Sequence, residues 1–322
     1  MPRAWAVVLL AALCAVVACA GDEPGMPEPA LSADQLQAME DRAADVARQL
    51  STWPDVEAFT ADYAEDFIFA DVSAADVRTG RDAVVAMLEL WANFTDYEIE
   101  VAGVFASPDG VACQERYPGL DYEPPGAAPQ LTEVTPPELQ SGLEVVRFGD
   151  SQLVESNLWR SVDDMHGYGI GCFAVDGCPA LEATIDAYVA AWSGRDGEAI
   201  SSLYHQDARF TDGVLGLSAS GDEAIAGLAD QRFGPTGEVT IEVLDRYVWT
   251  DGGGQPTDAA PRRGQLVAVA IHYEAGVAGV SETQHAVATL QLCAWEDNRC
   301  EPGPDGLIHR EDVYHRIGGV DG

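Results

Sequence analysis

The residue types that usually carry enzyme chemistry are unevenly represented in this sequence. All 17 basic residues are arginine, and lysine is absent. The absence of lysine excludes Schiff-base chemistry and a P-loop lysine, because both need a compact amine that arginine cannot replace. The six histidines are scattered, and neither an H-E-x-x-H nor a C-x-x-C motif occurs. We therefore expect no metal site and no cofactor.

Two other catalytic signatures are also missing. Residues 216–220 have the sequence G-L-S-A-S, which is not the G-x-S-x-G elbow of serine hydrolases. Glycines 252–254 lie in a predicted hairpin loop with no helix after it, which removes a dinucleotide-binding site.

The charge balance limits the partners of this protein. Acidic residues number 54 against 17 basic ones, for a formal charge of −37. Such a chain repels phosphate backbones and anionic lipid surfaces, so we expect no nucleic-acid partner. A hydrophobic share of 47% is ordinary for globular proteins, and the length of 322 residues predicts about two domains.

The N-terminus has the pattern of an export signal. Residues 1–18 carry one arginine and an apolar run too short for a comfortable membrane span. Residues 16–19 (VVAC) resemble the bacterial lipobox, which predicts a lipid on Cys19 and an exported protein anchored to the cell membrane or outer membrane. The alternative is an ordinary signal peptide in which Cys19 is incidental. Residues 19–31 are predicted to form an acidic Pro/Gly tether.

Export places five further cysteines in an oxidising compartment. The simplest pairing joins Cys172 with Cys178 and Cys293 with Cys300, and leaves Cys113 free. A bond between Cys113 and Cys172 is the alternative, because sequence alone does not fix connectivity.

The chain repeats itself with a spacing of 141 residues. Residues 55–71 (DVEAFTADYAEDFIFAD) align without a gap with residues 196–212 (DGEAISSLYHQDARFTD). Further along, residues 150–162 resemble residues 305–317. A period of this length predicts two complete domains rather than the units of a solenoid.

Each copy is predicted to begin with helices and to end with strands. Residues 32–35 form a capping box for a helix that runs to about Leu50, and Pro179 occupies the first position of the corresponding helix. Alternation such as that of Val239 and Ile241 predicts four long strands in the rest of each copy. The predicted fold class is α+β, with two tandem cone-shaped domains, each having three N-terminal helices packed in a curved antiparallel sheet.

Residues 185–228 resemble the opening half of a nuclear transport factor 2-like domain of the SnoaL-like or ketosteroid-isomerase-like kind. The shared features are an alanine-rich first helix, the pattern L-Y-x-x-D-A-x-F-x-D, and G-x-x-A-I at the start of a third helix. The first copy follows the same pattern more loosely. The resemblance predicts domains at 32–165 and 179–318, joined by a linker at 166–178 that holds one cysteine pair. Many catalytic and non-catalytic proteins share this fold, so it does not specify an activity.

The resemblance to ketosteroid isomerases implies a catalytic pair in the second copy. Asp212 falls where those enzymes have the general base, and Tyr188 falls where they have the phenol that stabilises the oxyanion. The third member, a protonated acid, would lie near residues 284–286, where the sequence has no acid and His285 could substitute. His272 and Asp71 are further candidates for lining a pocket.

A structural role is the alternative for Asp212, because an aspartate at the end of a strand can cap the following turn. Asp71 occupies the same position in the first copy, where the counterpart of Tyr188 is Ala47. Catalysis, if present, is therefore predicted only in the second copy.

Three classes of function follow. We favour a non-catalytic surface lipoprotein that binds a small apolar ligand or an envelope protein, with its two domains packed through their sheets as an internal pseudo-dimer. The alternatives are an isomerase or lyase acting on a carbonyl compound in the second domain, and a structural envelope component. A pocket lined by Tyr188, Asp212 and His285 would favour the enzyme.

Overall fold

The computed structural model describes residues 26–71, 76–94, 98–118, 141–149, 152–162, 179–250, 266–296, 299–302 and 306–316. The predicted signal peptide, Cys19, the linker with Cys172 and Cys178, and residues 119–140 and 251–265 lie outside these residues. We call residues 32–162 the first half and residues 179–316 the second half. Within the described residues, no helix is both long enough and apolar enough to cross a membrane.

The first half has the predicted order of helices and strands. Helix α1 (Ala33–Leu50) begins with the capping box, in which the Gln35 N–H donates to the Ser32 hydroxyl and the Gln35 side chain accepts from the Ser32 N–H. The later elements are α2 (Val56–Phe59), β1 (Tyr63–Asp71), β2 (Asp76–Thr79), α3 (Arg81–Phe94), β3 (Glu100–Ser107), β4 (Gly110–Arg116), β5 (Ser141–Gly149) and β6 (Gln152–Ser161).

The second half has a similar order, with its third helix broken in two. Helix α6 begins at Pro179, as predicted, and Gly227 ends helix α8 just before α9 begins. Its elements are α6 (Pro179–Gly194), α7 (Gly197–Leu203), β7 (Tyr204–Asp212), β8 (Leu217–Ser220), α8 (Asp222–Ala226), α9 (Ala229–Phe233), β9 (Val239–Thr250), β10 (Leu266–Val277), β11 (Thr283–Gln291), β12 (Cys293–Glu296), β13 (Arg299–Pro302) and β14 (Ile308–Arg316).

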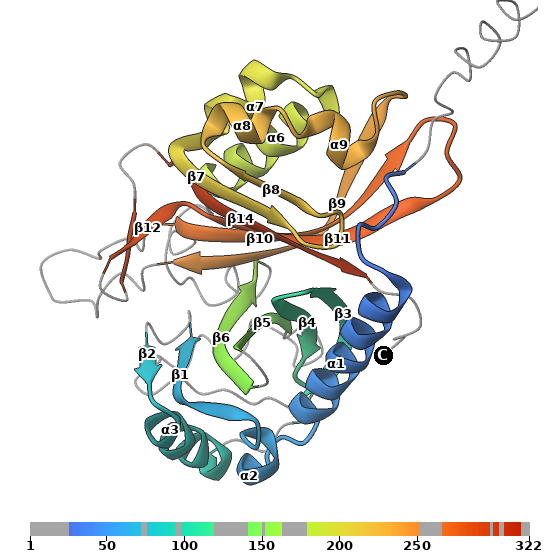
Figure 1. Ribbon diagram of the computed structural model, residues 1–322. Helices are drawn as coiled ribbons and strands as arrows, with labels where there is room; N and C mark the ends of the chain where they lie inside the picture. The colour runs from blue at the N-terminus through green and yellow to red at the C-terminus, as the bar shows by residue number, and fades with distance from the viewer. Residues whose placement is uncertain are drawn as a thin grey trace, which may run out of the picture.

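One long mixed sheet runs through both halves (Figure 1). Its order is β11-β10-β9-β6-β5-β4-β3-β14-β7-β8, with β1 and β2 attached at β6. The prediction of an antiparallel sheet is wrong at two places, because β1 runs parallel to β6 and β7 runs parallel to β14. In each half the first strand lies beside the last strand, and pairing over such a distance leaves no local signal in the sequence.

Eight of these strands close into a ring, because β11 also pairs with β14. The ring joins the halves at two short junctions, β3 with β14 and β6 with β9. Each of the eight strands contributes at least one buried side chain to a single cluster, which we call the ring core: Phe105, Ala112, Leu143, Val145, Trp159, Tyr247, Ala268, Ala270, Val287 and Tyr314, together with Ala70 of β1. The helices of the two halves lie on opposite sides of the strands (Figure 1).

Each half also has its own core between its helices and the other face of its strands. Strands alternate their side chains between faces, so successive residues serve the half's own core and the ring core in turn. In β11, for example, Ala286 and Ala288 face the helices of the second half, and Val287 lies in the ring core.

The segment before helix α1 contacts both halves. The Ala30 N–H donates to the Val214 carbonyl over 2.8 Å, Met26 packs against the core of the second half, and Leu31 packs against the core of the first. Residues 26–31 of the predicted tether are therefore packed against the folded chain.

The structure describes the side chain of only one of the five cysteines, Cys113. Cys113 is a buried free thiol, so the alternative bond to Cys172 is not formed. In the β12–β13 hairpin Cys293 lies opposite Pro302 and Cys300 lies opposite Trp295. The side chains of Cys293 and Cys300 lie outside the described residues, so this disulfide stays a prediction.

Candidate functional site

Asp212 ends strand β7 and is completely buried in the second half. His315 Nε2, from β14, lies 2.9 Å from Oδ1 and 2.8 Å from Oδ2 of Asp212. The Gln284 amide nitrogen lies 3.2 Å from His315 Nδ1, so the second ring nitrogen of His315 is held as well. The Leu215 N–H also donates to Asp212 over 3.0 Å, which is the turn cap that the structural alternative predicts.

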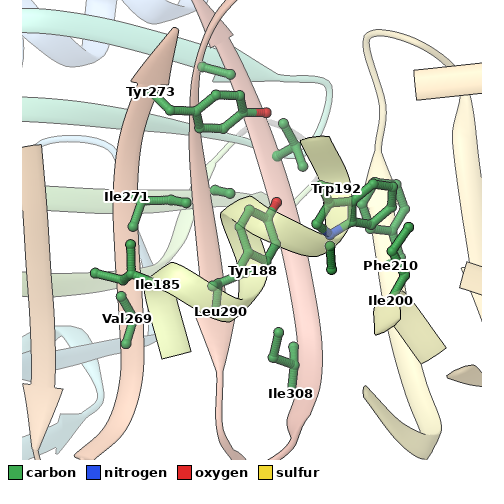
Figure 2. Close-up of a cluster of buried hydrophobic side chains, with 14 of the residues drawn as sticks. Ile185, Tyr188, Trp192, Ile200, Phe210, Val269, Ile271, Tyr273, Leu290 and Ile308 are labelled. Carbon is green, nitrogen blue, oxygen red and sulfur yellow. The ribbon is translucent and has the colours of Figure 1, made fainter. Parts of the chain in front are cut away.

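Tyr188 projects from α6 into the same interior, beside Trp192 (Figure 2). Its hydroxyl donates to Glu311 Oε1 on β14 over 2.6 Å, and the Tyr204 hydroxyl donates to the other carboxylate oxygen. The Trp192 indole in turn donates to the Tyr204 hydroxyl over 3.1 Å. Burial raises the pKa of Tyr188 well above its usual value, with Arg232 opposing and Glu311 adding to the rise. The phenol is therefore a hydrogen-bond donor at every physiological pH.

Arg232, from α9, completes this cluster. Its guanidinium is fully buried, with Nη1 3.0 Å from Glu311 Oε1 and Nη2 donating to the Tyr273 hydroxyl over 3.0 Å. The guanidinium carbon lies 4.4 Å from the centre of the Trp192 ring. We call Tyr188, Trp192, Tyr204, Arg232, Tyr273 and Glu311 the Arg232 cluster. Its members fill the interior of the second half and are joined by hydrogen bonds and by the Arg232–Glu311 ion pair, while Nε and Nη1 of Arg232 have no hydrogen-bond partner within the described residues.

The other pocket candidates lie elsewhere. Ala286 and Tyr273 lie in the core of the second half. The preceding residues, His285 and His272, therefore lie on the other face of β11 and β10, because side chains alternate along a strand. His285 Nδ1 lies 3.1 Å from the Glu274 carboxylate, and His272 Nδ1 lies 2.8 Å from Asp245. The structure thus brings Asp212 and Tyr188 into one interior but does not add His285. Asp71 ends β1, and its side chain lies outside the described residues.

The interior of the first half carries carboxylates that the sequence analysis missed. Ser156 donates to Glu144, and the Tyr117 hydroxyl donates to Glu115 over 2.6 Å. Glu144 and Ser156 help line a cavity of about 10 Å³, which is room for roughly one water. Burial, with Glu144 and Glu115 adding to it, raises the pKa of Tyr63 well above its usual value. In the sequence, each of these acids stands at a strand position where the two-residue alternation places apolar, inward-facing side chains.

A larger groove lies between the two halves. It has a volume of about 280 Å³. Its lining comes from Ser107, Pro108, Asp109, Arg147, Phe148, Val154 and Glu155 of the first half and from Thr211, Gly213, Arg310, Asp312, Val313 and Tyr314 of the second. We call it the interhalf groove. Neither half forms it alone.

Charged side chains meet at the interhalf groove. Arg147 Nη2 lies 2.5 Å from Asp312 Oδ2, and Arg310 Nε lies 2.8 Å from the same oxygen. Arg42 of α1 lies with its guanidinium 4.6 Å from the centre of the Phe148 ring. The groove therefore combines apolar walls with guanidinium groups.

A second, more open hollow of about 620 Å³ lies on the second half near Ser201, His205 and Asp222. The rings of His205 and His309 stack there at 4.5 Å. In the part of the chain that the structure describes, no group of three or more His, Cys, Asp or Glu side chains is placed to hold a metal ion.

One family profile matches the chain, that of the SnoaL-like domain, over residues 49–155. This region lies in the first half, so the chain contains one SnoaL-like domain there. The match does not reach residues 185–228, where the sequence resemblance is closest. No curated protein matches the chain significantly.

Several solved structures resemble part of the chain. A protein from Catenulispora acidiphila DSM 44928 with a ketosteroid isomerase-like fold, crystallised with trimethylamine, is 16% identical, with 42% of this chain and 88% of that chain covered and a TM-score of 0.28. A SnoaL-like protein of unknown function from Burkholderia thailandensis E264 is 18% identical, with 41% and 97% covered and a TM-score of 0.29. An NTF2-like protein of unknown function from Cytophaga hutchinsonii ATCC 33406 is 12% identical, with 42% and 88% covered and a TM-score of 0.27. Values this low support no conclusion about activity.

Proposed function

We propose that this protein is a non-catalytic, exported binding protein made of two SnoaL-like domains in tandem. The observation that carries the proposal is the filled interior of the second half. The groups that an isomerase would use are already engaged, Asp212 by His315 and Tyr188 by Glu311. Both groups are buried in this structure, so neither is exposed to a carbonyl substrate here.

The positions of the strands support a tandem repeat. Strands β1 and β7 begin at Tyr63 and Tyr204, which are 141 residues apart. Phe69 of β1 lies opposite Ser156, and its repeat partner Phe210 of β7 lies opposite Glu311. The same parallel pairing of first and last strands therefore recurs at equivalent positions.

The contacts between the halves support an internal pseudo-dimer. The last strand of the first half, β6, pairs with β9, and the last strand of the second half, β14, pairs with β3. At these junctions Tyr247 lies opposite Ser161, and Phe105 lies opposite Arg316. Phe105 and Tyr247 occupy equivalent positions in the two halves. Phe105 lies opposite Ala112 in the β3–β4 pair, and Tyr247 lies opposite Ala270 in the β9–β10 pair. Such reciprocal contact is what a two-fold axis produces.

The interhalf groove is the proposed ligand site. Its volume of about 280 Å³ is close to the lower end of the range for small-molecule pockets, about 300–1,000 Å³. The cavity of about 10 Å³ in the first half is too small for an organic ligand. Apolar side chains such as Phe148 and Val154 would contact the body of a small apolar molecule there.

Export and anchoring belong to the same proposal. Residues 1–18 and the lipobox before Cys19 support a lipid-anchored protein, exported to the cell membrane or outer membrane. The packing of residues 26–31 would hold the folded chain close to this anchor.

Fluorescence of the uncharged probe N-phenylnaphthylamine tests the site. We expect saturable binding to the wild type, and at least a tenfold loss of affinity in Val154→Trp, because about one aromatic ring of added volume fills part of the groove. Val243→Trp is the matched control, since Val243 is also half-buried on a strand but lies outside the groove. Absence of binding to the wild type, or equal binding to both variants, would refute the proposed site.

A further inference from the structure

We propose that the interhalf groove recognises a small molecule with a carboxylate head and an apolar body, and that Arg147 and Arg310 bind the carboxylate. This inference rests on the proposed function, because it names the ligand class of the same groove. It adds a polar requirement that a purely apolar ligand would not meet.

The first step is the convergence of two guanidiniums from different halves. Arg147 comes from β5 and Arg310 from β14, and both contact one carboxylate, Asp312. Asp312 accepts from Arg147 Nη2 and from Arg310 Nε and Nη2, the last over 3.3 Å. A carboxylate therefore already fits between these two side chains, and it belongs to the chain itself.

The second step is the supply of donors. Each guanidinium carries five N–H groups, and Asp312 engages only some of them. The Arg147 and Arg310 side chains are 22% and 38% exposed, so donors can reach a ligand in the groove. Burial lowers the pKa of Arg147, but Tyr314, Asp312 and Glu155 raise it by more, so its charge persists at all relevant pH values. Planar guanidiniums match a carboxylate in geometry and give charge-assisted hydrogen bonds.

The third step is the local charge balance. The chain as a whole has 54 acidic residues to 17 arginines. Three acidic residues line the groove, and two arginines line it with a third beside it, so the formal charges balance there. The acids are Asp109, Glu155 and Asp312, and the arginines are Arg147, Arg310 and the neighbouring Arg42. An anion that the rest of this surface repels meets far less repulsion here, which directs anionic ligands to this place.

The fourth step is the division of the lining between head and body. Phe148 and Val154 are half-buried and present apolar surface beside the two guanidiniums. A ligand of matching shape would place its carboxylate on the arginines and its hydrocarbon part on this surface. Asp312 competes with such a ligand for the same donors, so its removal should strengthen binding.

Displacement of N-phenylnaphthylamine by naphthoate and by naphthamide tests the proposal, since the two competitors differ in charge but hardly in shape. We expect naphthoate to bind about tenfold more tightly to the wild type, the value of one good charge-assisted contact. Arg310→Gln and Arg147→Gln should bring the two affinities to within about twofold. Asp312→Asn should widen the difference instead.

Arg48→Gln is the matched control, because it removes the same charge from the exposed surface of α1. It should leave the preference for naphthoate unchanged. Arg310 is the more exposed of the two groove arginines, so its variant keeps the test valid even where Arg147→Gln fails to fold.

The proposal is overturned if the wild type binds naphthamide as tightly as naphthoate, or if the preference survives in both folded glutamine variants. A preference for naphthylmethylammonium would also overturn it, since Asp109 and Glu155 would then dominate recognition. Each of these results leaves N-phenylnaphthylamine bound, so it is distinct from failure of the groove as a binding site.

Discussion

Replacing Arg232 by methionine is the sharpest test of the filled interior in the second half. Methionine keeps an unbranched apolar stem of similar length but carries no charge. In the Arg232→Met variant Glu311 would retain two phenol donors, Tyr188 and Tyr204, and lose its cation. The variant therefore separates the ion pair from the packing around it.

The expected loss of stability follows from burial. The side chains of Arg232 and Glu311 are 1% and 0% exposed, so water and salt screen their attraction very little. Removing one partner of a buried ion pair costs about 3–5 kcal/mol, because the other charge stays buried without compensation. We expect the free energy of unfolding to fall by about 4 kcal/mol, a large share of the roughly 5–15 kcal/mol that folded proteins possess.

Urea unfolding followed by tryptophan fluorescence measures this loss, because Trp192 lies against the guanidinium. The double variant Arg232→Met with Glu311→Gln should recover most of the loss, since a neutral pair leaves no unpaired charge. Arg48→Met is the control. Its ion pair with Asp45 is exposed on α1, and its loss should cost less than about 1 kcal/mol.

Two results would refute the reasoning. One is an Arg232→Met variant that unfolds no more easily than Arg48→Met. The other is a double variant that is as unstable as the single one. The first result would mean that Glu311 does not depend on Arg232. The second would mean that the loss comes from altered packing and not from an unpaired buried charge.

Three other outcomes are expected. Burial raises the pKa of five of the ten tyrosines, and unfolded phenols ionise near pH 10, so stability should fall as the pH rises above about 10. The tyrosinate absorbance of these five should appear only together with unfolding, and titration of all ten tyrosines before unfolding would contradict this. Cys19→Ser should release the protein from the membrane fraction, and unchanged fractionation with no acyl chain on the wild type by mass spectrometry would refute the anchor. The wild type, Asp212→Asn and Tyr188→Phe should all fail to move the double bond of a conjugatable ketone; an activity that falls about a hundredfold in both variants would establish the isomerase instead.

Local signals in the sequence predicted local structure well. The capping box at Ser32 and the proline at position 179 mark the first residues of α1 and α6, because both features act within one helical turn. The 141-residue spacing aligns Tyr63 with Tyr204, and these two residues are the first of β1 and β7. Long-range pairing was less accessible, as the parallel contacts of β1 and β7 show.

The candidate site was only partly accessible from sequence. Asp212 and Tyr188 were found through a pattern, and they do face one interior. Their partners Glu311 and Arg232 were missed, because charged residues are usually exposed and a single sequence does not tell a buried charge from a solvated one. Which face of a strand His285 occupies depends on register, and a shift by one residue would reverse it.

The proposed repeat also explains why the missed residues belong together. With the 141-residue spacing, Arg232 corresponds to Trp91, which packs edge-on against Phe69 at 5.9 Å in the first half. Glu311 corresponds to Ser156, since the two lie opposite Phe210 and Phe69. The second half thus has both the buried cation and the buried acid. The first half has tryptophan and serine at the two corresponding positions. At these two positions each charge compensates the other, so the pair is expected to be kept or lost together, whereas the buried Glu115 and Glu144 of the first half occupy other positions. The two halves therefore share a backbone plan while their interiors differ by coupled exchanges, which leaves the interhalf groove as the place where both halves contribute to one surface.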